Sequence, residues 1–368
     1  MIEFDQVSKK YGDVEAIDNI SFTIPEGEIW VLIGPSGCGK STTLKMVNRM
    51  LEATAGSIYI HGSDVTSLPP ETLRRKIGYV IQDIGLFPHF TVVDNIGIVP
   101  KLLGWKKERR KERGYELLEL IGLHPEEYAR KYPHELSGGE AQRIGVARSL
   151  AADPPILLMD EPFGAVDPLN RDVLQREFLS LHRKLKKTVL FVTHDLDEAI
   201  RIGDQIVLMK NGHIEQMDKP ETILSLPKNR FVKNFVGADR ALKMLARYEV
   251  RDRMEPSGTI FVTDFFTQEL YEKHKNELFL WAVDSNNYLK GWIDMVETDI
   301  GKPVKDIMTP ILPKDICINQ NSSLKIALSR MLGQGIQYLP VINDNWHLIG
   351  QINMREIEKI TDKGDFSW

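Results

Sequence analysis

The sequence predicts an α/β fold in which a mostly parallel sheet is covered by helices on both faces. Three apolar runs predict buried strands at 29–33, 156–159 and 189–192. A helical pattern follows the first of these strands at 43–49, and another separates the other two at 168–186. Strands that alternate with helices form βαβ units, and such units place their strands parallel in one sheet.

Other segments add strands and helices around this sheet. Residues 1–30 alternate between apolar and polar side chains, which predicts short strands with a turn at 25–27. The pattern becomes helical at 95–103, and a charged run at 106–113 leads into a helix at 115–121. The charged run is typical of a solvated helix face.

The pattern changes near residues 238–250, where we expect a domain boundary. The last third of the chain then contains a weak internal repeat. Segment 250–256 matches segment 304–310, and segment 281–293 matches segment 339–352. Two similar units predict a pseudo-symmetric pair that bury each other's apolar faces. The alternative is a chance likeness between two short αβ patterns.

Composition excludes several classes of protein. A chain of 368 residues predicts two or three domains, and its 42% hydrophobic and 27% charged content is ordinary for soluble globular protein. The net charge of −5 argues against nucleic acid as the main partner, because proteins that bind it usually carry a basic surface. No apolar run approaches the roughly 18 residues of a membrane span, and residues 1–5 lack the features of a signal peptide. Cys38 and Cys317 are the only cysteines, and a disulfide at Cys38 would obstruct the glycine-rich turn around it, so we expect a reducing compartment.

The glycine-rich turn at 34–42 has the composition of a phosphate-binding loop. It lies between a strand and a helix, which is the context that such a loop requires. Glycines let backbone N–H groups turn toward an anion, and a helix N-terminus adds donors and a favourable dipole. We expect Lys40 to reach the terminal phosphates and Ser41 to hold Mg²⁺; the alternative is a chance glycine-rich turn. The nucleotide-binding residues predicted in this turn are Gly34, Ser36, Gly37, Cys38, Gly39, Lys40, Ser41 and Thr42.

Two adjacent carboxylates follow the apolar strand at 156–159. Asp160 is a hard oxygen ligand that would bind Mg²⁺ directly or through water. Glu161 is expected to point the other way along the pleat, where it would orient or deprotonate an attacking water. The alternative for two acids after a strand is a solvated turn.

A second glycine-rich helix start consists of Ser137, Gly138 and Gly139, followed by Glu140. It is again suited to contact phosphate. Two such anion sites, well separated in sequence, suggest that one site completes the other across a dimer interface.

With these motifs in place, residues 1–240 resemble the ATPase subunit of an ATP-binding cassette (ABC) transporter. The resemblance implies a P-loop (RecA-like) nucleotide-binding domain with an antiparallel β subdomain and a helical subdomain. It also implies ATP and Mg²⁺ as cofactors and a homodimer that sandwiches two ATP molecules head to tail. Each nucleotide would be held by Lys40 of one copy and by Ser137 and Gly139 of the other. Closure would switch the membrane subunits, and hydrolysis at Glu161 would reset them.

The same resemblance gives roles to four further residues. Tyr11 stands where the family has an adenine-stacking aromatic ring, and Asp167 stands in the D-loop. Gln82 matches the glutamine that contacts Mg²⁺ and the attacking water. His194 matches the switch histidine that senses the γ-phosphate; the alternative for a lone histidine after a strand is a structural role.

Two positions depart from the family pattern. Glu140 replaces the usual glutamine after the two glycines, and Val166 stands where leucine is common. Because Ser137, Gly138 and Gly139 are kept, we expect ATP hydrolysis to survive these changes.

The C-terminal repeat resembles a tandem CBS pair, with a degenerate copy at 250–300 and a clearer copy at 303–363. Cassettes with such a pair are characteristic of importers of osmoprotectants, which are quaternary amines such as glycine betaine, carnitine, choline and proline betaine. The segment 84–96 also resembles importer cassettes, at a surface that normally receives the coupling helix of a membrane subunit. The resemblance implies transmembrane permease subunits and a solute-binding protein as partners, with the chain at the cytoplasmic face of the cell membrane.

CBS pairs often bind adenine nucleotides, and in this family the pair senses ionic strength or cyclic di-adenosine monophosphate. Glu297 and Glu356 stand where a ribose-binding aspartate is usual, and Asp294 and Asn353 replace the hydroxyl residues expected before it. This argues against adenosine monophosphate as the ligand. The alternative for the whole module is a structural role in dimerisation.

Two rival functions stay open on the sequence alone. A different ABC importer, such as one for sugars, would carry a strand-rich regulatory barrel in place of the repeat found here. A soluble ABC ATPase that acts on DNA or ribosomes would usually have two cassettes in one chain or a long coiled-coil insertion.

Overall fold

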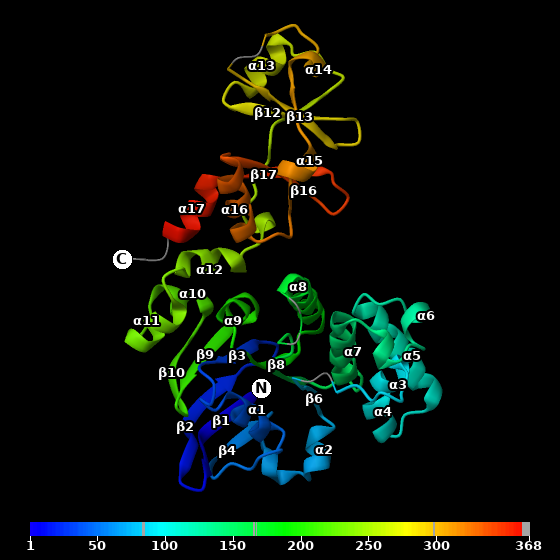
Figure 1. Ribbon diagram of the computed structural model, residues 1–368, viewed down its shortest axis with the longest axis vertical. Coiled ribbons are helices and arrows are strands. Elements are labelled where there is room, and N and C mark those ends of the chain that lie inside the picture. The colour runs from blue at the N-terminus through cyan, green and yellow to red at the C-terminus, as the bar shows by residue number, and fades with distance from the viewer. Residues whose placement is uncertain (83–84, 165, 167, 297–298, 363–368) are drawn as a thin grey trace. The chain divides into compact units, whose positions relative to one another are not determined.

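A computed structural model shows how the predicted elements are arranged (Figure 1). The residues that it describes fall into two compact units, Met1–Gly237 and Ala238–Trp368. The division between them lies next to the change of sequence pattern near 238–250. The described residues are 1–82, 85–164, 166, 168–296 and 299–362.

A six-stranded sheet with the order β10-β9-β3-β8-β7-β6 forms the centre of the first unit. Its strands are parallel except β10, which pairs antiparallel with β9 at one edge. Three of them, β3, β7 and β8, are buried at every position, which explains why they are continuous apolar runs in the sequence. The strands are β3 (Ile29–Ile33), β6 (Ile77–Val80), β7 (Ile156–Asp160), β8 (Thr188–Val192), β9 (Gln205–Lys210) and β10 (His213–Asp218).

Several helices pack on this sheet, with α1 against β7 and β8 and α9 against β3. The helix predicted at 168–186 is α8, and the helix predicted at 43–49 begins earlier, at the lysine that ends the glycine-rich turn. This early start puts the first turn of α1 within the loop motif itself. The helices are α1 (Lys40–Val47), α2 (Pro70–Arg74), α8 (Pro168–Leu185), α9 (Leu196–Ile202), α10 (Pro220–Ser225) and α11 (Arg230–Val236).

A second sheet, antiparallel throughout and ordered β2-β1-β4-β5, covers part of the first. The two sheets share one hydrophobic core, in which Phe4 stacks on Phe22 with ring centroids 4.3 Å apart, and Phe22 stacks on Trp30 of β3 at 5.8 Å. This column of aromatic rings fixes the antiparallel sheet to the strand that precedes the glycine-rich turn. Its strands are β1 (Ile2–Tyr11), β2 (Val14–Ile24), β4 (Ala55–Ile60) and β5 (Ser63–Asp64).

A group of helices lies between β6 and β7 in the sequence and forms a third part of the first unit. The helical pattern predicted at 95–103 is confirmed, but it forms two short helices, α3 and α4, which meet at Gly97. The charged run at 106–113 is the first half of α5, and most of its side chains are exposed, as predicted for a solvated face. The helices are α3 (Val92–Ile96), α4 (Ile98–Leu102), α5 (Lys107–Leu120), α6 (Pro125–Tyr128) and α7 (Gly138–Leu150).

The second unit is built from two similar β-hairpins. In each, a short strand pairs parallel with the first hairpin strand, and the antiparallel register shifts by one step at the same place, before Val283 in one copy and before Ile342 in the other. The strands are β11 (Thr259–Phe261), β12 (Phe279–Val283), β13 (Leu289–Asp294), β14 (Thr309–Pro310), β15 (Ile318–Asn319), β16 (Tyr338–Ile342) and β17 (Leu348–Asn353). The helices are α12 (Arg240–Arg247), α13 (Gln268–His274), α14 (Val304–Ile307), α15 (Pro313–Ile316), α16 (Leu324–Gln334) and α17 (Met354–Asp362).

The two copies exchange their first segments. Thr309, near the start of the second copy, pairs with β13 of the first, and Glu255, near the start of the first copy, pairs with β17 of the second. A Cβ atom at Gly291 would lie 2.5 Å from the Thr309 carbonyl oxygen, and one at Gly350 would lie 2.6 Å from the Glu255 carbonyl oxygen. The repeated glycines are therefore needed for close approach of the exchanged segments.

None of the helices in the described part of the chain has the length and apolar composition that crossing a membrane requires.

Candidate functional site

The predicted site residues follow four neighbouring strands of the parallel sheet. The glycine-rich turn at 34–42 follows β3, His194 follows β8, Asp160 ends β7 with Glu161 directly after it, and Gln82 follows β6. Because these strands are parallel, their carboxyl ends meet at one edge of the sheet. Open α/β sheets bind ligands at this edge.

The glycine-rich turn is shaped by close backbone contacts. Gly34 has φ 151°, and a Cβ atom there would lie 2.1 Å from the carbonyl oxygen of Met209. Gly39 has φ 105°, and its Cβ atom would lie 2.3 Å from a side-chain carbon of Ile17. Gly39 also caps α1 without any side-chain hydrogen bond. The first N–H groups of α1 thus keep their capacity to bind an anion.

Lys40 lies within the turn and is only 7% exposed. Its ammonium group donates to the carbonyl oxygens of Gly34 at 2.8 Å and Pro35 at 3.0 Å. These bonds satisfy the buried charge and hold it at the concave side of the turn. Phosphate oxygens would offer stronger, charge-assisted bonds to the same group.

Ser41 and Asp160 bring two oxygen ligands together. The Ser41 hydroxyl donates to Oδ1 of Asp160 at 3.0 Å, and Asp160 is 6% exposed. Burial raises the pKa of this carboxyl, and the bond from Ser41 opposes the rise. Burial and the nearby Asp160 also raise the pKa of Tyr79 to about 12. A buried carboxylate beside a hydroxyl suits a hard cation such as Mg²⁺.

The described residues hold no cluster of three or more metal-binding His, Cys, Asp or Glu side chains. A cation at Ser41 and Asp160 would therefore complete its shell with water and phosphate oxygens. This is the usual arrangement for Mg²⁺ at nucleotide sites, where the protein supplies only one or two ligands.

Glu161 contacts His194 across the ends of β7 and β8. Its Oε2 atom lies 2.9 Å from Nδ1 of the imidazole. The expectation that Glu161 continues the pleat is wrong, because β7 ends at Asp160 and Glu161 has φ 46°. Its N–H donates to the carbonyl of Val192 at 2.9 Å, which holds this unusual backbone against β8 and turns the carboxylate toward the histidine.

One cavity of about 340 Å³ joins Lys40, Ser41, Glu161 and His194, whereas the predicted Gly34, Cys38 and Asp160 do not line it. Tyr11 and Gln82 do not line it: Tyr11 is 46% exposed at the end of β1, with the Lys9 ammonium 5.2 Å from its ring centroid, and Gln82 is exposed beyond the end of β6. Asp167 lies outside the described residues. Sequence reasoning missed one lining residue, Ala16, which carries no polar group to signal its role. The lining residues are Ala16, Ser36, Gly37, Gly39, Lys40, Ser41, Thr42, Glu161 and His194.

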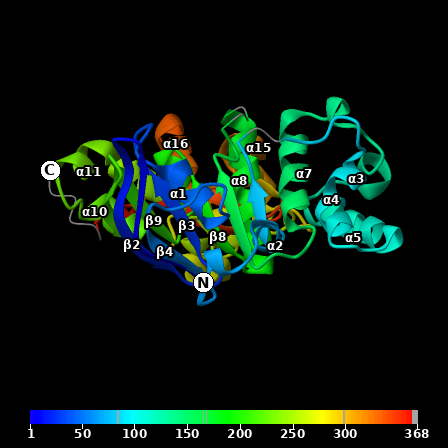
Figure 2. The same ribbon diagram turned by 90° about the horizontal axis from the view of Figure 1, so that it is seen from below.

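The second glycine-rich segment starts α7, away from this cavity. Ser137 caps the helix: its hydroxyl accepts from the N–H of Glu140 at 3.4 Å, and the Glu140 carboxylate accepts from the N–H of Ser137 at 2.7 Å. A Cβ atom at Gly138 would meet nothing within 4 Å, so glycine here leaves the backbone open to a ligand. Figure 2 shows α7 well separated from α1, and Gly139 does not line the cavity either. One chain therefore does not bring its two anion sites together.

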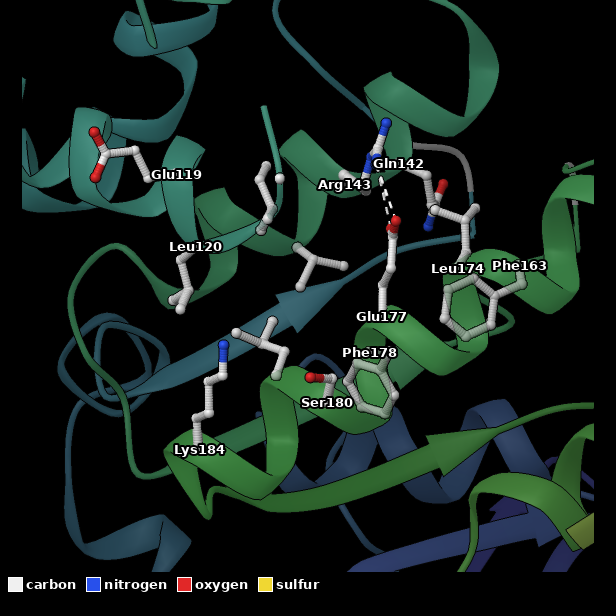
Figure 3. A pocket seen from close by; sticks show the side chains of 14 residues that line it. Glu119, Leu120, Gln142, Arg143, Phe163, Leu174, Glu177, Phe178, Ser180 and Lys184 are labelled. Atoms are coloured by element: carbon white, nitrogen blue, oxygen red, sulfur yellow. Dashed lines mark hydrogen bonds and ion pairs between the residues drawn. The ribbon is translucent and has the colours of Figure 1, made fainter. Parts of the chain in front are cut away.

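A further cavity, of about 230 Å³, lies between α7 and α8 (Figure 3), close in sequence to the signature segment, as we call Ser137, Gly138 and Gly139. Arg143 and Glu177 form an ion pair at 3.3 Å across it. Gln142 is 1% exposed, and among the described residues its amide nitrogen and oxygen have no hydrogen-bond partner. Both atoms are buried, so a ligand in the cavity would not reach them. Burial without a hydrogen-bond partner lowers the stability of the fold.

In the second unit, a residue near the expected ribose contact already bonds to another part of the chain. The side-chain amides of Asn353 and Gln351 donate to Oε1 of Glu255 at 2.8 and 3.1 Å, and the Trp281 indole donates to Gln351 at 3.0 Å. Glu356 pairs with a lysine one turn later in α17, and Glu297 lies outside the described residues. Asn353, which replaces one of the usual hydroxyls, thus binds the exchanged segment, whereas the Asp294 carboxylate accepts from the N–H of Val296 at 2.8 Å.

Comparison with known proteins decides the family. A model described as ABC transporter matches residues 17–164, and a model described as CBS domain matches residues 304–361. The chain is 45% identical over 367 residues to the glycine betaine/carnitine/choline transport ATP-binding protein of Bacillus subtilis (strain 168), a match that covers 98% of this chain and 96% of that protein. This chain belongs to the ABC transporter family, among the ATP-binding subunits of osmoprotectant importers.

Other relatives agree with this ABC assignment. The carnitine transport ATP-binding protein of Listeria monocytogenes is 43% identical over 98% of this chain and 92% of its own. The osmoprotectant import ATP-binding protein of Salmonella typhimurium is 41% identical over 97% and 94%. The predicted family, with its C-terminal CBS region, is confirmed, and this ABC subunit is an ATPase.

Solved structures confirm the predicted cassette fold. The dimeric structure of a bacterial ABC transporter cassette matches 60% of this chain and 98% of its own, with 35% identity and a TM-score of 0.53. A dimeric post-hydrolysis state of an ATP-binding cassette, bound to ADP and phosphate, matches with 34% identity and the same TM-score of 0.53. The residue-level roles and the boundaries at 240, 250–300 and 303–363 stay predictions.

Proposed function

We propose that this ABC subunit couples ATP binding and hydrolysis to the import of a quaternary-amine solute: glycine betaine, carnitine, choline or proline betaine. The observation that carries this function is the 45% identity to a Bacillus subtilis transport protein over 98% of the chain, the CBS region included. The solute would pass through transmembrane permease subunits that receive it from a solute-binding protein. The chain would be held at the cytoplasmic face of the membrane by those permease subunits.

Phe87 and Phe90 supply a surface for the permease. Both rings are exposed, by 49% and 41%, and their centroids lie 5.6 Å apart. They lie a few residues after Gln82 in the sequence, so that a partner bound there would affect the position of Gln82. An exposed aromatic pair of this kind is typical of a protein–protein contact rather than of a solvated loop.

Lys40 and the N-terminus of α1 would hold the β- and γ-phosphates of ATP, since both face the cavity at the end of β3. Tyr11 would stack on the adenine. Mg²⁺, when bound, would neutralise charge on the phosphates, and Ser41, Asp160 and Gln82 are the residues that would hold it.

Glu161 would orient and deprotonate the attacking water. The carboxylate lines the cavity, and its Oε2 atom already lies within hydrogen-bond distance of Nδ1 of His194, at 2.9 Å. The imidazole would hold the carboxylate toward the γ-phosphate and would register whether that phosphate is present. Positioning and charge stabilisation supply most of the catalysis in phosphoryl transfer, which fits a site made of fixed donors.

A second copy of the chain would complete the site. Ser137, Gly138 and Gly139 of one copy would contact the ATP bound at Lys40 of the other, with Asp167 near the shared interface. The separation of α7 from α1 within one chain supports this arrangement (Figure 2).

The CBS region would regulate transport. Ionic strength or cyclic di-adenosine monophosphate would change how readily two cassettes close, and a coupling of this kind is typically worth about 1–3 kcal/mol. The use of Asn353 and Gln351 as partners of Glu255 argues against a ribose contact at these positions.

Uptake by the complex reconstituted in proteoliposomes tests the proposal. We expect ATP-dependent accumulation of at least one radiolabelled betaine from a panel of quaternary amines, and none of a sugar or an uncharged amino acid. A complex lacking residues after 250 should keep ATP hydrolysis and lose its response to salt or to the cyclic dinucleotide. Uptake of none of the quaternary amines would refute the solute class, and an unchanged response would leave the CBS region as a dimerisation module.

A further inference from the structure

Tyr128 makes a short hydrogen bond to Glu140, one of the two residues at which this chain departs from the usual family pattern. Its hydroxyl donates to Oε1 of Glu140 at 2.6 Å. Tyr128 is the last residue of α6, and Glu140 lies in the first turn of α7, so the bond joins two separate helices. Both side chains are partly buried, which shields the bond from competing water.

The other oxygen of the same carboxylate acts on the signature segment. Oε2 of Glu140 accepts from the N–H of Ser137 at 2.7 Å, while the N–H of Glu140 donates to the Ser137 hydroxyl oxygen at 3.4 Å. Glu140 therefore links the Tyr128 hydroxyl to the backbone of Ser137. Because the Ser137 oxygen accepts from the helix, its own proton is left to donate outward.

Tyr128 is itself held in place from two sides. The Lys131 ammonium lies 3.9 Å from the centroid of its ring. The segment that follows Tyr128 is bonded to the start of α3, where the N–H groups of Val92 and Val93 donate to the carbonyls of Lys131 at 2.8 Å and Ala129 at 3.1 Å. The hydroxyl is thus a fixed point in the helical part of the cassette.

A carboxylate suits this double role better than an amide. Both neighbours of Glu140 donate, and a carboxylate offers an acceptor oxygen to each of them. The bond from Tyr128 lowers the pKa of Glu140, so the charged form persists at neutral pH. A glutamine would have to accept from Ser137 and donate to the tyrosine oxygen instead, which keeps the link with weaker, neutral bonds.

We propose that Tyr128 is a positioning residue for ATP hydrolysis, which acts through Glu140 to fix Ser137 in the orientation that receives the nucleotide of a second copy. This inference rests on the proposed role of Ser137, Gly138 and Gly139 in the ATP sandwich. Tyr128 itself touches no nucleotide. Its removal would leave binding at Lys40 intact and would impair closure of the dimer.

The first experiment compares Tyr128→Phe with wild type in two settings. In the permease complex, kcat for ATP should fall roughly threefold to tenfold. A hydrogen bond to a charged group is lost, and part of the lost free energy destabilises the closed dimer. In the full chain alone, ATP affinity should stay within about twofold of wild type, because Lys40 and the N-terminus of α1 are untouched. ATP-driven dimerisation of a Glu161→Gln chain should need severalfold more protein when Tyr128→Phe is added.

Tyr115→Phe in α5 is the matched control. Lys111 lies over the face of that ring, at 5.3 Å from its centroid, so loss of the hydroxyl leaves the contact in place. It should change neither kcat nor dimerisation. An equal effect of both variants would show that either change destabilises the helical part of the cassette as a whole, and it would overturn the proposal.

A double-mutant cycle tests the route through Glu140. Tyr128→Phe should have no further effect in a Glu140→Ala chain, and Glu140→Gln, which keeps the link, should lie within about threefold of wild type. A full additional loss in the Glu140→Ala chain would contradict the inference. If Ser137→Ala leaves dimerisation unchanged, the proposed role of the signature segment fails; if Ser137→Ala impairs dimerisation and Tyr128→Phe does not, only this inference fails.

Discussion

The Oε2 atom of Glu161 lies 2.9 Å from Nδ1 of His194, across the ends of two neighbouring parallel strands. The contact depends on a backbone that L-residues rarely adopt, because Glu161 has φ 46° and is held by the carbonyl of Val192. The carboxylate is thereby turned out of the strand direction and into the cavity that Lys40 and Ser41 also line. Strain at such a residue is typical of functional sites and persists only where the surroundings hold it.

Lys40→Ala should abolish nucleotide binding rather than slow its hydrolysis. The ammonium group that offsets the charge of the β- and γ-phosphates is removed, and no other lysine or arginine lines the cavity among the described residues. Calorimetric titration of the full chain with Mg-ATP checks this, with Lys45→Ala as a control on the same helix. Wild-type affinity in Lys40→Ala would show that the phosphates bind elsewhere.

Gln142→Leu should stabilise the protein. The amide is 1% exposed and has no partner among the described residues, and a buried unsatisfied polar group costs about 1–3 kcal/mol. The leucine removes that penalty, so the midpoint of thermal unfolding should rise by a few degrees.

Asn95→Leu is the matched control for Gln142→Leu. Asn95 is also fully buried, but its amide accepts from the N–H of Phe87 at 2.7 Å and donates to the carbonyls of Phe87, Phe90 and Thr91 at 3.1 Å each. This variant should lower the midpoint of thermal unfolding, because it leaves several backbone groups without a hydrogen-bond partner. Destabilisation by both variants would mean that Gln142 is satisfied in solution.

Gly350→Ala should destabilise the C-terminal unit and leave ATP hydrolysis intact. Its Cβ atom would lie 2.6 Å from the Glu255 carbonyl oxygen, and overpacking of this kind costs typically about 1–3 kcal/mol. Gly333→Ala is the control, because Gly333 lies inside α16 where a Cβ atom meets nothing within 4 Å. That change should stabilise by about 0.5–1 kcal/mol. Equal outcomes in differential scanning calorimetry would refute the exchanged pairing.

Glu198 should make stability fall as pH rises through neutrality. Burial raises its pKa from an ordinary value of 4.5 to about 7, so the folded state binds this proton more tightly than the unfolded state. The contribution to stability is full below about pH 4.5 and is lost as pH rises through 7. Glu198→Gln keeps an acceptor for the amide of Gln175, which donates to Glu198 at 3.1 Å. Urea unfolding at pH 6 and pH 8 should show a loss of about 1–3 kcal/mol in wild type and a much smaller loss in the variant; identical pH profiles would contradict the buried, protonated state.

The parallel sheet could be predicted because its central strands are buried on both faces. The run at 29–33 coincides with β3, and the runs at 156–159 and 189–192 each fall one residue short of β7 and β8. Periodicity showed that segment 95–103 is helical but not that Gly97 separates α3 from α4. A single glycine is compatible with a continuous helical pattern, so the sequence carries no signal for the break.

The site could be predicted residue by residue but not atom by atom. Spacing after each strand placed Asp160 and His194 at one edge, since parallel strands share a direction. It did not show that Glu161 leaves the pleat, because a positive φ for glutamate has no sequence signal. Nor did it show the bond between Tyr128 and Glu140, which depends on how two helices joined by a loop fold back on each other.

Glu161→Gln tests the central claim most directly. This variant keeps the cavity and the charge of Lys40 and removes the carboxylate that would act on water. In the reconstituted complex, the steady-state rate of ATP hydrolysis should fall at least ~10²-fold, as for loss of a general base, and solute uptake should stop. ATP binding should persist, and the full chain should accumulate as an ATP-bound dimer in size-exclusion chromatography. Hydrolysis at the wild-type rate, with uptake of the quaternary amine unchanged, would contradict the assignment of Glu161 and with it the account of this site.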